Sequence, residues 1–360
     1  MKLFDEIKGL FRRPRFKLLT LFVTNRCNAR CGACFYWRDL NKRVDALSPS
    51  EYRRIAAQMP PLDGLLVSGG EPTLVENLAE IIGTFVTGPW QTINMPTNGL
   101  RTDQVAARVR EILERLPENQ VVIGVSIDAK ELLNDEIRGV PGIYRAALRT
   151  LEELARLKGD FPNLRLTTLT TVMDVNQNEV GELLRDLAAL GHADFFSVEP
   201  LRHAHPSEKI GPPDPEKLAA IHEICNELSL ASLRERHPED AALMLSHIRA
   251  LNREQIHVMK TGRMRFDCLA GEIAAVLEPD GAVRLCELLD PVGNVRDFDC
   301  NLMAVLQSRA AREQIGAIRR RDCSCTHCVN VGQSLPFHFL SELARLRDQR
   351  RIEKTRPPAA

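Results

Sequence analysis

The stretch that decides the fold is residues 18–34, which read LLTLFVTNRCNARCGAC. Its first seven residues are mostly apolar and have the length of a buried strand. Cys27, Cys31 and Cys34 follow, with gaps of three and two residues. A short loop after a strand can turn three thiolates toward one point, and soft thiolates select iron–sulfur clusters, zinc or Cu(I). Three thiolates ligate three irons of a [4Fe–4S] cluster and leave the fourth iron open to another ligand.

Length, charge and cysteine usage narrow the class of protein. The chain has 360 residues, 44% of them hydrophobic, which suits two domains or one large α/β domain with an appendage. The 48 basic residues balance 48 acidic ones, so no overall field attracts nucleic acid. No apolar run approaches the ~20 residues that span a bilayer, and the first residues lack the apolar core of a secretory signal. Ten cysteines in two tight groups then indicate metal binding in a reducing cytoplasm.

Apolar strands alternate with helical patterns up to residue 202. The predicted strands are Leu18–Thr24, Gly64–Ser68, Thr92–Thr97, Val121–Asp128, Leu164–Met173 and Asp194–Pro200. The predicted helices between them are Ser50–Gln58, Asn77–Val86, Asp103–Leu116, Ile143–Lys158 and Asn178–Leu190. This alternation is typical of a parallel sheet with right-handed crossovers. In parallel α/β folds, catalytic and binding residues gather at the C-terminal ends of the strands. The cysteine loop begins at such a strand end.

Two further features establish a family resemblance. The aromatic residue Tyr36 follows the Cys-x3-Cys-x2-Cys spacing, and Gly69-Gly70-Glu71-Pro72 ends the second strand. Together they resemble the radical S-adenosylmethionine (SAM) enzymes. The resemblance implies an α/β fold, a partial (β/α)6 barrel, with a [4Fe–4S] cluster on the three cysteines and SAM on its open iron. In that family an electron from the cluster cleaves SAM to methionine and a 5′-deoxyadenosyl radical, which abstracts a substrate hydrogen. A zinc site or unrelated buried thiols are the simpler alternatives.

The resemblance also assigns SAM contacts at the strand ends. Tyr36 takes the position of the aromatic ring near the adenine. Carbonyls of residues 69–72 are expected to bind the SAM amino group, with Glu71 adding negative charge, and glycine lets the backbone approach a ligand closely. Turns, strand caps or a surface ion pair are the alternatives. The predicted SAM-binding residues are Tyr36, Gly69, Gly70, Glu71, Pro72, Asn98, Ser126, Asp128 and Arg138.

Glu199 is the candidate catalytic residue. It lies in the segment Val198-Glu199-Pro200 at the end of the sixth strand, where it can face the substrate. A structural carboxylate is the alternative.

A second cysteine group lies in the C-terminal third. Cys268 and Cys286 bracket Gly281 as Cys-x12-Gly-x4-Cys, which resembles the opening of the SPASM and twitch extensions of some radical SAM enzymes. These extensions bind auxiliary iron–sulfur clusters. The terminal run of residues 323–328 departs from the full SPASM pattern, so a twitch-like extension with one auxiliary [4Fe–4S] cluster is expected. The expected ligands are Cys268, Cys286, Cys325 and Cys328, with Cys323 as a substitute for Cys325, and Cys300 as a bystander. A tetrahedral zinc site is the alternative.

The chain is expected to form five segments. A basic amphipathic helix at the N-terminus either packs beneath the barrel, which we favour, or touches a membrane surface. The segments are 1–17 (this helix), 18–202 (radical SAM partial barrel), 203–262 (helical bridging region), 263–335 (SPASM/twitch-like auxiliary cluster domain, an α+β extension) and 336–360 (C-terminal helix and tail).

These features predict a radical SAM oxidoreductase with the auxiliary cluster as electron acceptor. The expected substrate is a small molecule or a cofactor or natural-product precursor, and a peptide-modifying maturase or crosslinking enzyme is the alternative. A non-catalytic iron–sulfur or zinc protein that transfers electrons or acts as a scaffold is the alternative from another class. A flavodoxin- or ferredoxin-type donor would supply electrons, and no nucleic-acid partner is expected.

Overall fold

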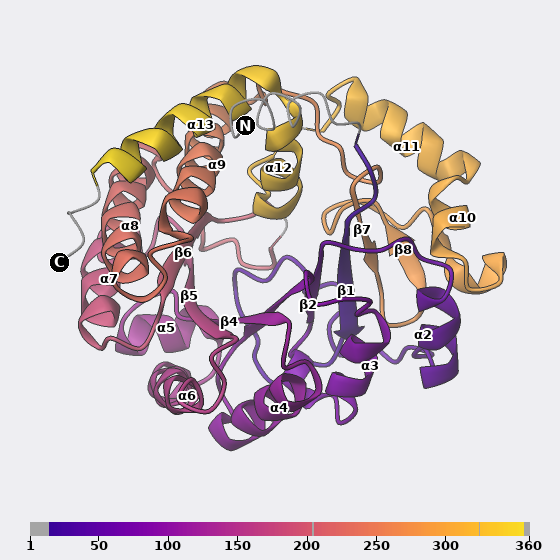
Figure 1. Cartoon of the computed structure of the whole chain (residues 1–360), viewed down its shortest axis with the longest axis horizontal. Helices are drawn as coiled ribbons and strands as arrows, with labels where there is room; N and C mark the ends of the chain where they lie inside the picture. The colour runs from indigo at the N-terminus through magenta and orange to yellow at the C-terminus, as the bar shows by residue number, and fades with distance from the viewer. Residues whose placement is uncertain (1–13, 204, 324, 356–360) are drawn as a thin grey trace.

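A single mixed sheet organises the molecule (Figure 1). The computed structural model describes residues 14–203, 205–323 and 325–355. Within these residues nine strands lie in the order β6-β5-β4-β3-β2-β1-β7-β8-β9. Strands β1 to β6 pair in parallel, so their C-terminal ends share one edge. The strands are β1 (Leu18–Thr24), β2 (Gly64–Gly69), β3 (Thr92–Thr97), β4 (Gln120–Ser126), β5 (Leu164–Val172), β6 (Phe195–Pro200), β7 (Ala274–Leu277), β8 (Ala282–Arg284) and β9 (Gly293–Asn294).

Helices connect the parallel strands. They are α2 (Pro49–Ala56), α3 (Leu78–Thr84), α4 (Thr102–Arg115), α5 (Glu131–Arg138), α6 (Ile143–Leu157) and α7 (Val180–Ala189). The predicted α/β fold is confirmed, and the six predicted strands agree with the observed bounds to within two residues. Local chemistry explains these bounds: α2, for example, begins with a capping box in which Ser48 and Glu51 bond each other's backbone N–H. The sequence did not predict α5, which is only two turns long.

The C-terminal extension continues the sheet. Strand β7 pairs in parallel with β1, with Leu18 opposite Ala274, and all seven residues of β1 are buried between β2 and β7. Strands β7 and β8 form an antiparallel hairpin. Its turn needs a glycine, because Gly281 has a φ of +87° and an added Cβ would lie 2.8 Å from Asn294 Oδ1. The extension is therefore built onto the edge of the barrel.

Further helices form a group next to the β6 end of the sheet, where α8 contacts β6. They are α8 (Pro215–Arg236), α9 (Ala241–Thr261), α12 (Cys328–Ser334) and α13 (Phe339–Lys354), and the extension adds α10 (Leu302–Leu306) and α11 (Arg309–Arg319). Helix α9 contacts α8, α12 and α13, and Figure 1 shows α13 running across the end of α9. Cys225 of α8 is buried in the main core. Among the described residues, no helix is long and apolar enough to cross a membrane.

Of two predicted terminal helices, one needs correction and the other lies mostly outside the described residues. The C-terminal helix predicted within residues 336–360 starts at Phe339, and its residue Leu340 is 67% exposed. Arg345 and Ile352 are its buried residues, because the helix covers α9 with a different face. The N-terminal helix predicted for residues 1–17 lies mostly outside the described residues, and residues 14–17 are not helical.

Candidate active site

The cysteine loop of residues 27–34 is fastened to the end of helix α5. The backbone N–H of Arg30 donates to the carbonyl of Arg138 at 3.2 Å, and the N–H of Gly32 donates to that of Ile137 at 2.8 Å. Gly139 caps α5 with a φ of +67°, and an added Cβ there would lie 2.4 Å from the Arg30 carbonyl oxygen. The loop that carries the three thiols is therefore positioned by close backbone packing.

The three thiols of this loop lie close enough together for the charge of one to change the pKa of another. Burial raises the pKa of Cys27 to about 11 and that of Cys34 to about 12, and the charge of Cys31 adds to both shifts. Two donors approach the sulfurs: Asn98 Nδ2 lies 3.9 Å from Cys27 Sγ, and Arg138 Nη1 lies 3.9 Å from Cys31 Sγ. Buried thiolates require positive charge, which a bound cluster supplies.

Three thiols on one loop match the three protein ligands of a [4Fe–4S] cluster with one open iron. Across the described parts of the chain, no group of three or more Cys, His, Asp or Glu side chains is arranged to hold one metal ion. A zinc ion would draw its ligands to about 2.3 Å from one centre. Thiolates on different irons of a cluster are spread around a larger body, as three thiols on one loop can be.

Gly69 and Gly70 bring the second strand against the cysteine loop. An added Cβ would lie 2.2 Å from the Thr24 carbonyl oxygen at Gly69, and 2.1 Å from that of Arg26 at Gly70. The N–H of Gly70 donates to Thr24 and the N–H of Glu71 to Arg26. These glycines thus fit two loops together, and their contact with SAM stays a prediction.

Glu71 is the centre of a buried polar network. Its carboxylate accepts from the N–H and hydroxyl of Thr73, from the hydroxyl of Thr97 at 2.9 Å and from the N–H of Asn98 at 2.8 Å. Burial raises the pKa of this carboxyl, while these donors oppose the rise. Pro72 begins a short 3-10 turn directly after it. Glu71 therefore holds the loops after β2 and β3 in one arrangement.

Asp128 and Arg138 form a buried ion pair beside the cysteine loop. Arg138 Nε lies 2.7 Å from Asp128 Oδ2, and the other carboxylate oxygen accepts from the N–H of Thr171 at 2.7 Å. Ser126 is half-buried at the end of β4. The structure thus brings the candidates from β4 and α5 together with the Cys31 sulfur.

Tyr36 links the barrel to the extension. Its ring packs edge-on against Phe22 at 4.9 Å between centroids, and its hydroxyl donates to Glu278 Oε2 at 2.6 Å. Arg284 Nε lies 2.8 Å from the other oxygen of Glu278. Sequence analysis missed Glu278, and no local pattern marks it, because its partner lies 242 positions earlier in the chain.

Glu199 lies in a polar cluster at the end of β6. Gln255 Nε2 of α9 donates to Glu199 Oε2 at 2.6 Å, and burial raises the pKa of Glu199 to about 7 against the lowering effect of Arg202. Arg202 stacks over Phe35 at 4.2 Å and pairs with Glu287. Its position two residues after β6 was a usable signal that sequence analysis overlooked.

The C-terminal cysteines lie between the barrel and the outer helices. Cys268 precedes β7, Cys286 follows β8, Cys323 and Cys325 separate α11 from α12, and Cys328 begins α12. Cys300 is buried in the main core. His327 caps α12 through the N–H of Asn330 and lies 2.9 Å from Glu287.

Comparison with known proteins identifies the family. The model of the radical SAM superfamily matches residues 21–187, which contain the cysteine loop and the ends of β1 to β5. The matched residues belong to the radical SAM superfamily. Sporulation killing factor maturation protein SkfB of Bacillus subtilis is 23% identical over 325 residues, which is 88% of this chain and 71% of SkfB.

Other relatives match a smaller share of this chain or show its fold alone. Fe-coproporphyrin III synthase of Methanosarcina barkeri is 28% identical over 39% of this chain, and the match spans about a third (34%) of that relative's length. The solved structure of Streptococcus suis SuiB bound to S-adenosylmethionine is 17% identical, with a TM-score of 0.58 over 88% of this chain and 71% of that one. The structure of anSMEcpe with bound AdoMet and a Cp18Cys peptide, at 16% identity, has a TM-score of 0.54 over 95% of this chain and 98% of that one.

Proposed function

We propose that the protein is an oxidoreductase that binds SAM over a [4Fe–4S] cluster held by Cys27, Cys31 and Cys34. The observation that carries the proposal is the cysteine loop, whose three thiols lie together where β1 ends and where α5 and the loops after β2 and β3 converge. With the cluster and SAM bound, reductive cleavage of SAM supplies the 5′-deoxyadenosyl radical that abstracts a substrate hydrogen. The chain's own residues bind, orient and enclose these partners.

We assign SAM to the edge formed by the loops after β1 to β4. Arg138 and Asp128 are charged groups next to the Cys31 sulfur, and Ser126 lies on the same edge. Backbone groups of residues 69–72 and Asn98 stand beside the first cysteine, and their positions depend on the Glu71 network. Tyr36 is proposed to border the adenine.

Glu199 is proposed to contact the substrate. It is half-buried where the last parallel strand meets α9, and a pKa near 7 lets it hold or release a proton at neutral pH. Its neighbour Arg202 provides a positive charge at the same strand end.

The extension is proposed to bind one auxiliary [4Fe–4S] cluster that accepts an electron during substrate oxidation. Support comes from five thiols in three segments: one before β7, one after β8, and one from the end of α11 to the start of α12. A flavodoxin- or ferredoxin-type donor in a reducing cytoplasm is proposed to supply electrons, in keeping with ten cysteines that form no disulfide.

A peptide is the substrate class that the extent of the matches favours. SkfB, a maturation protein for the sporulation killing factor, is matched over 88% of this chain, whereas Fe-coproporphyrin III synthase is matched over 39%. SuiB has been solved with its precursor peptide SuiA, and its fold covers 88% of this chain. The small-molecule substrate predicted from the sequence is the second candidate.

Anaerobic reconstitution tests the proposed function. We would count iron and sulfide and measure 5′-deoxyadenosine from SAM under reduction, in the wild type and in a Cys27/Cys31/Cys34→Ala variant. Two [4Fe–4S] clusters mean about eight irons in the wild type and about four in the variant. The Cys225→Ala variant, which removes a core thiol of α8, should behave as the wild type. Full iron without SAM cleavage would overturn the enzymatic proposal.

A second assay separates the two substrate classes. The wild type would be incubated with SAM and reductant, and with either the peptides retained on dialysis of a cell extract or the small molecules that pass the membrane. Stimulation of 5′-deoxyadenosine formation by the retained peptides alone supports a peptide substrate. Stimulation by the dialysed small molecules alone rejects it.

A further inference from the structure

The auxiliary site contains more thiols than one cluster needs. An iron–sulfur cluster held by cysteines alone uses four of them. Apart from Cys300, which is buried in the main core, the extension offers five: Cys268, Cys286, Cys323, Cys325 and Cys328. The identity of the four ligands decides which thiol remains free, and where it faces.

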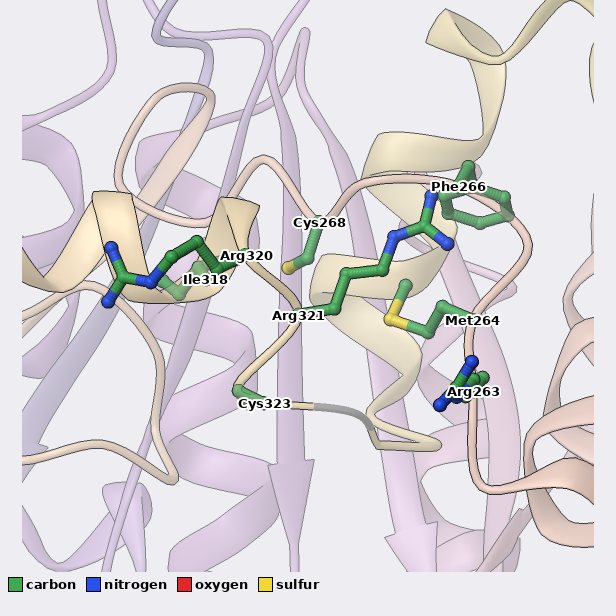
Figure 2. Close-up of a pocket in the computed structure, with 8 residues that line it drawn as sticks. All are labelled: Arg263, Met264, Phe266, Cys268, Ile318, Arg320, Arg321 and Cys323. Atoms are coloured by element: carbon green, nitrogen blue, oxygen red, sulfur yellow. The ribbon is translucent and has the colours of Figure 1, made fainter.

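Cys268 and Cys323 face the same pocket. They come from segments 55 positions apart, the loop before β7 and the segment after α11, and both line a cavity of about 260 Å³. Figure 2 shows the Cys268 sulfur pointing toward the chain that leads from α11 to Cys323. Arg263, Arg320 and Arg321 border this cavity, which suits the negative charge of a thiolate-bound cluster.

The electrostatic contacts of the thiols form a closed ring. The charge of Cys268 raises the pKa of Cys286, and the charge of Cys323 raises the pKa of Cys268. Cys268 therefore interacts with thiols from both neighbouring segments. The charge of Cys286 raises the pKa of Cys325, which shares a thiol hydrogen bond with Cys323. Each of these four thiols therefore interacts with two others of the set, as ligands of one cluster would.

Cys328 faces the barrel instead. Arg202 Nη2 lies 3.9 Å from its sulfur, and its thiol donates to the carboxylate of Glu199. Glu287 is its third charged neighbour. These contacts come from the end of β6 and from the segment after β8.

We propose that Cys268, Cys286, Cys323 and Cys325 hold the auxiliary cluster, and that Cys328 remains a free thiol in the polar cluster of Glu199 and Arg202. The family resemblance predicts Cys328 as a ligand in the Cys-x2-Cys pair, and the geometry favours Cys323 in its place. Cys328 then lies on the substrate side of the auxiliary site, beside the proposed substrate-contacting carboxylate. This inference rests on the proposed auxiliary cluster.

The test measures iron bound by the full chain rather than turnover. All variants are made in the Cys27/Cys31/Cys34→Ala background, so that the remaining iron belongs to the auxiliary site. To this background we add Cys323→Ala, Cys328→Ala or the control Cys300→Ala, which removes a thiol of the main core. Alanine is used because a serine oxygen can replace a lost thiolate. Iron, sulfide and the cluster absorption spectrum are recorded, and circular dichroism checks folding.

The expected result is a separation of the two variants. Cys323→Ala should lose most of the auxiliary iron and its absorption, whereas Cys328→Ala and Cys300→Ala should keep both. Loss in Cys328→Ala, or retention in Cys323→Ala, would overturn the assignment. Absence of iron from the background itself would remove the auxiliary cluster from the proposed function and the assignment with it, whereas the first cluster is tested separately in the wild type.

A second measurement keeps the assignment falsifiable if Cys323→Ala does not fold. In the reconstituted background variant, the protein is denatured anaerobically while an alkylating reagent is present, with and without prior removal of iron by a chelator. A free Cys328 is alkylated at the same rate in both samples once the chain opens. Protection of Cys328 that follows the cluster absorption, and disappears with it, would identify a ligand.

Discussion

Glu71 shows how a residue with a clear motif position can act through its neighbours. Sequence analysis placed it near SAM as a source of negative charge. In the structure its two oxygens are used by Thr73, Thr97 and Asn98, all within the protein. A buried carboxylate with several donors is a rigid support, because each donor would be left unsatisfied without it.

Replacement of Glu71 by glutamine should therefore weaken both folding and SAM binding. The amide turns N–H groups toward donors, so we expect a loss of about 1–3 kcal/mol in the free energy of unfolding. The matched control is Glu76→Gln, an exposed carboxylate on the same segment. Denaturant unfolding and SAM binding by equilibrium dialysis measure the two effects. Wild-type values for Glu71→Gln would show that the network is dispensable.

The other candidate site residues differ in how easily they can be predicted from the sequence. Cys27, Cys31 and Cys34 were found because a loop motif keeps its spacing in any fold of the family. Glu278 was not found, because its bond to Tyr36 joins residues 242 positions apart and neither has a distinctive neighbour pattern. Long-range pairs of this kind depend on strand order.

At the scale of elements, two glycines beside α5 offer a matched comparison. Gly139 and Gly142 have φ values of +67° and +81°, so alanine strains both by about 1 kcal/mol. At Gly142 an added Cβ meets nothing within 4 Å, whereas at Gly139 it lies 2.4 Å from the Arg30 carbonyl oxygen in the cysteine loop.

We therefore expect Gly139→Ala to lower iron content and SAM cleavage as well as stability. Gly142→Ala should lose stability by the strain alone and keep its iron. Iron per chain after reconstitution and denaturant unfolding provide the measurements. Equal iron content in the two variants would mean that the cysteine loop does not depend on its packing against α5.

Helix α2 is tied to the extension by a pH-sensitive ion pair. Arg296 Nε lies 2.6 Å from Glu51 Oε1, and this bond, with the capping contacts of Ser48, lowers the pKa of Glu51 to about 2. The folded state therefore favours the ionised carboxylate. Its stabilising contribution is present above the ordinary pKa of 4.5 and is lost as the pH falls from there toward 2.

Glu51→Gln should cost about 1 kcal/mol at pH 7, because glutamine keeps the capping bond but loses the ion pair. The difference from the wild type should shrink between pH 4.5 and pH 3. Urea unfolding across this range is the measurement, with the exposed Glu114→Gln as control. A difference that stays constant with pH would contradict the assignment to the ion pair.

At the scale of the whole molecule, the barrel and the extension share a strand pair. Because β7 is hydrogen-bonded to β1, the two parts should open together. Leu277→Ala removes a fully buried side chain of β7 and should cost about 2–5 kcal/mol. Hydrogen exchange should then show loss of protection in β1 as well as in β7.

This prediction has a control variant and a result that would contradict it. Leu243→Ala, on an exposed position of α9, should leave exchange in both strands unchanged. If Leu277→Ala releases β7 alone while β1 keeps its protection, the extension is an independent unit that merely touches the barrel.

The sequence by itself determined the six parallel strands, the cysteine loop and the edge of the sheet on which chemistry collects. Apolar runs and ligand spacing are local properties, so they can be read without knowing which segments meet. Only the tertiary structure decided that β7 extends the barrel sheet, that Tyr36 bonds Glu278, and that Cys328 faces Arg202 while Cys323 faces Cys268. The five thiols of the extension look equivalent in sequence, because the direction of each side chain is set by the packing of the helices and strands around it.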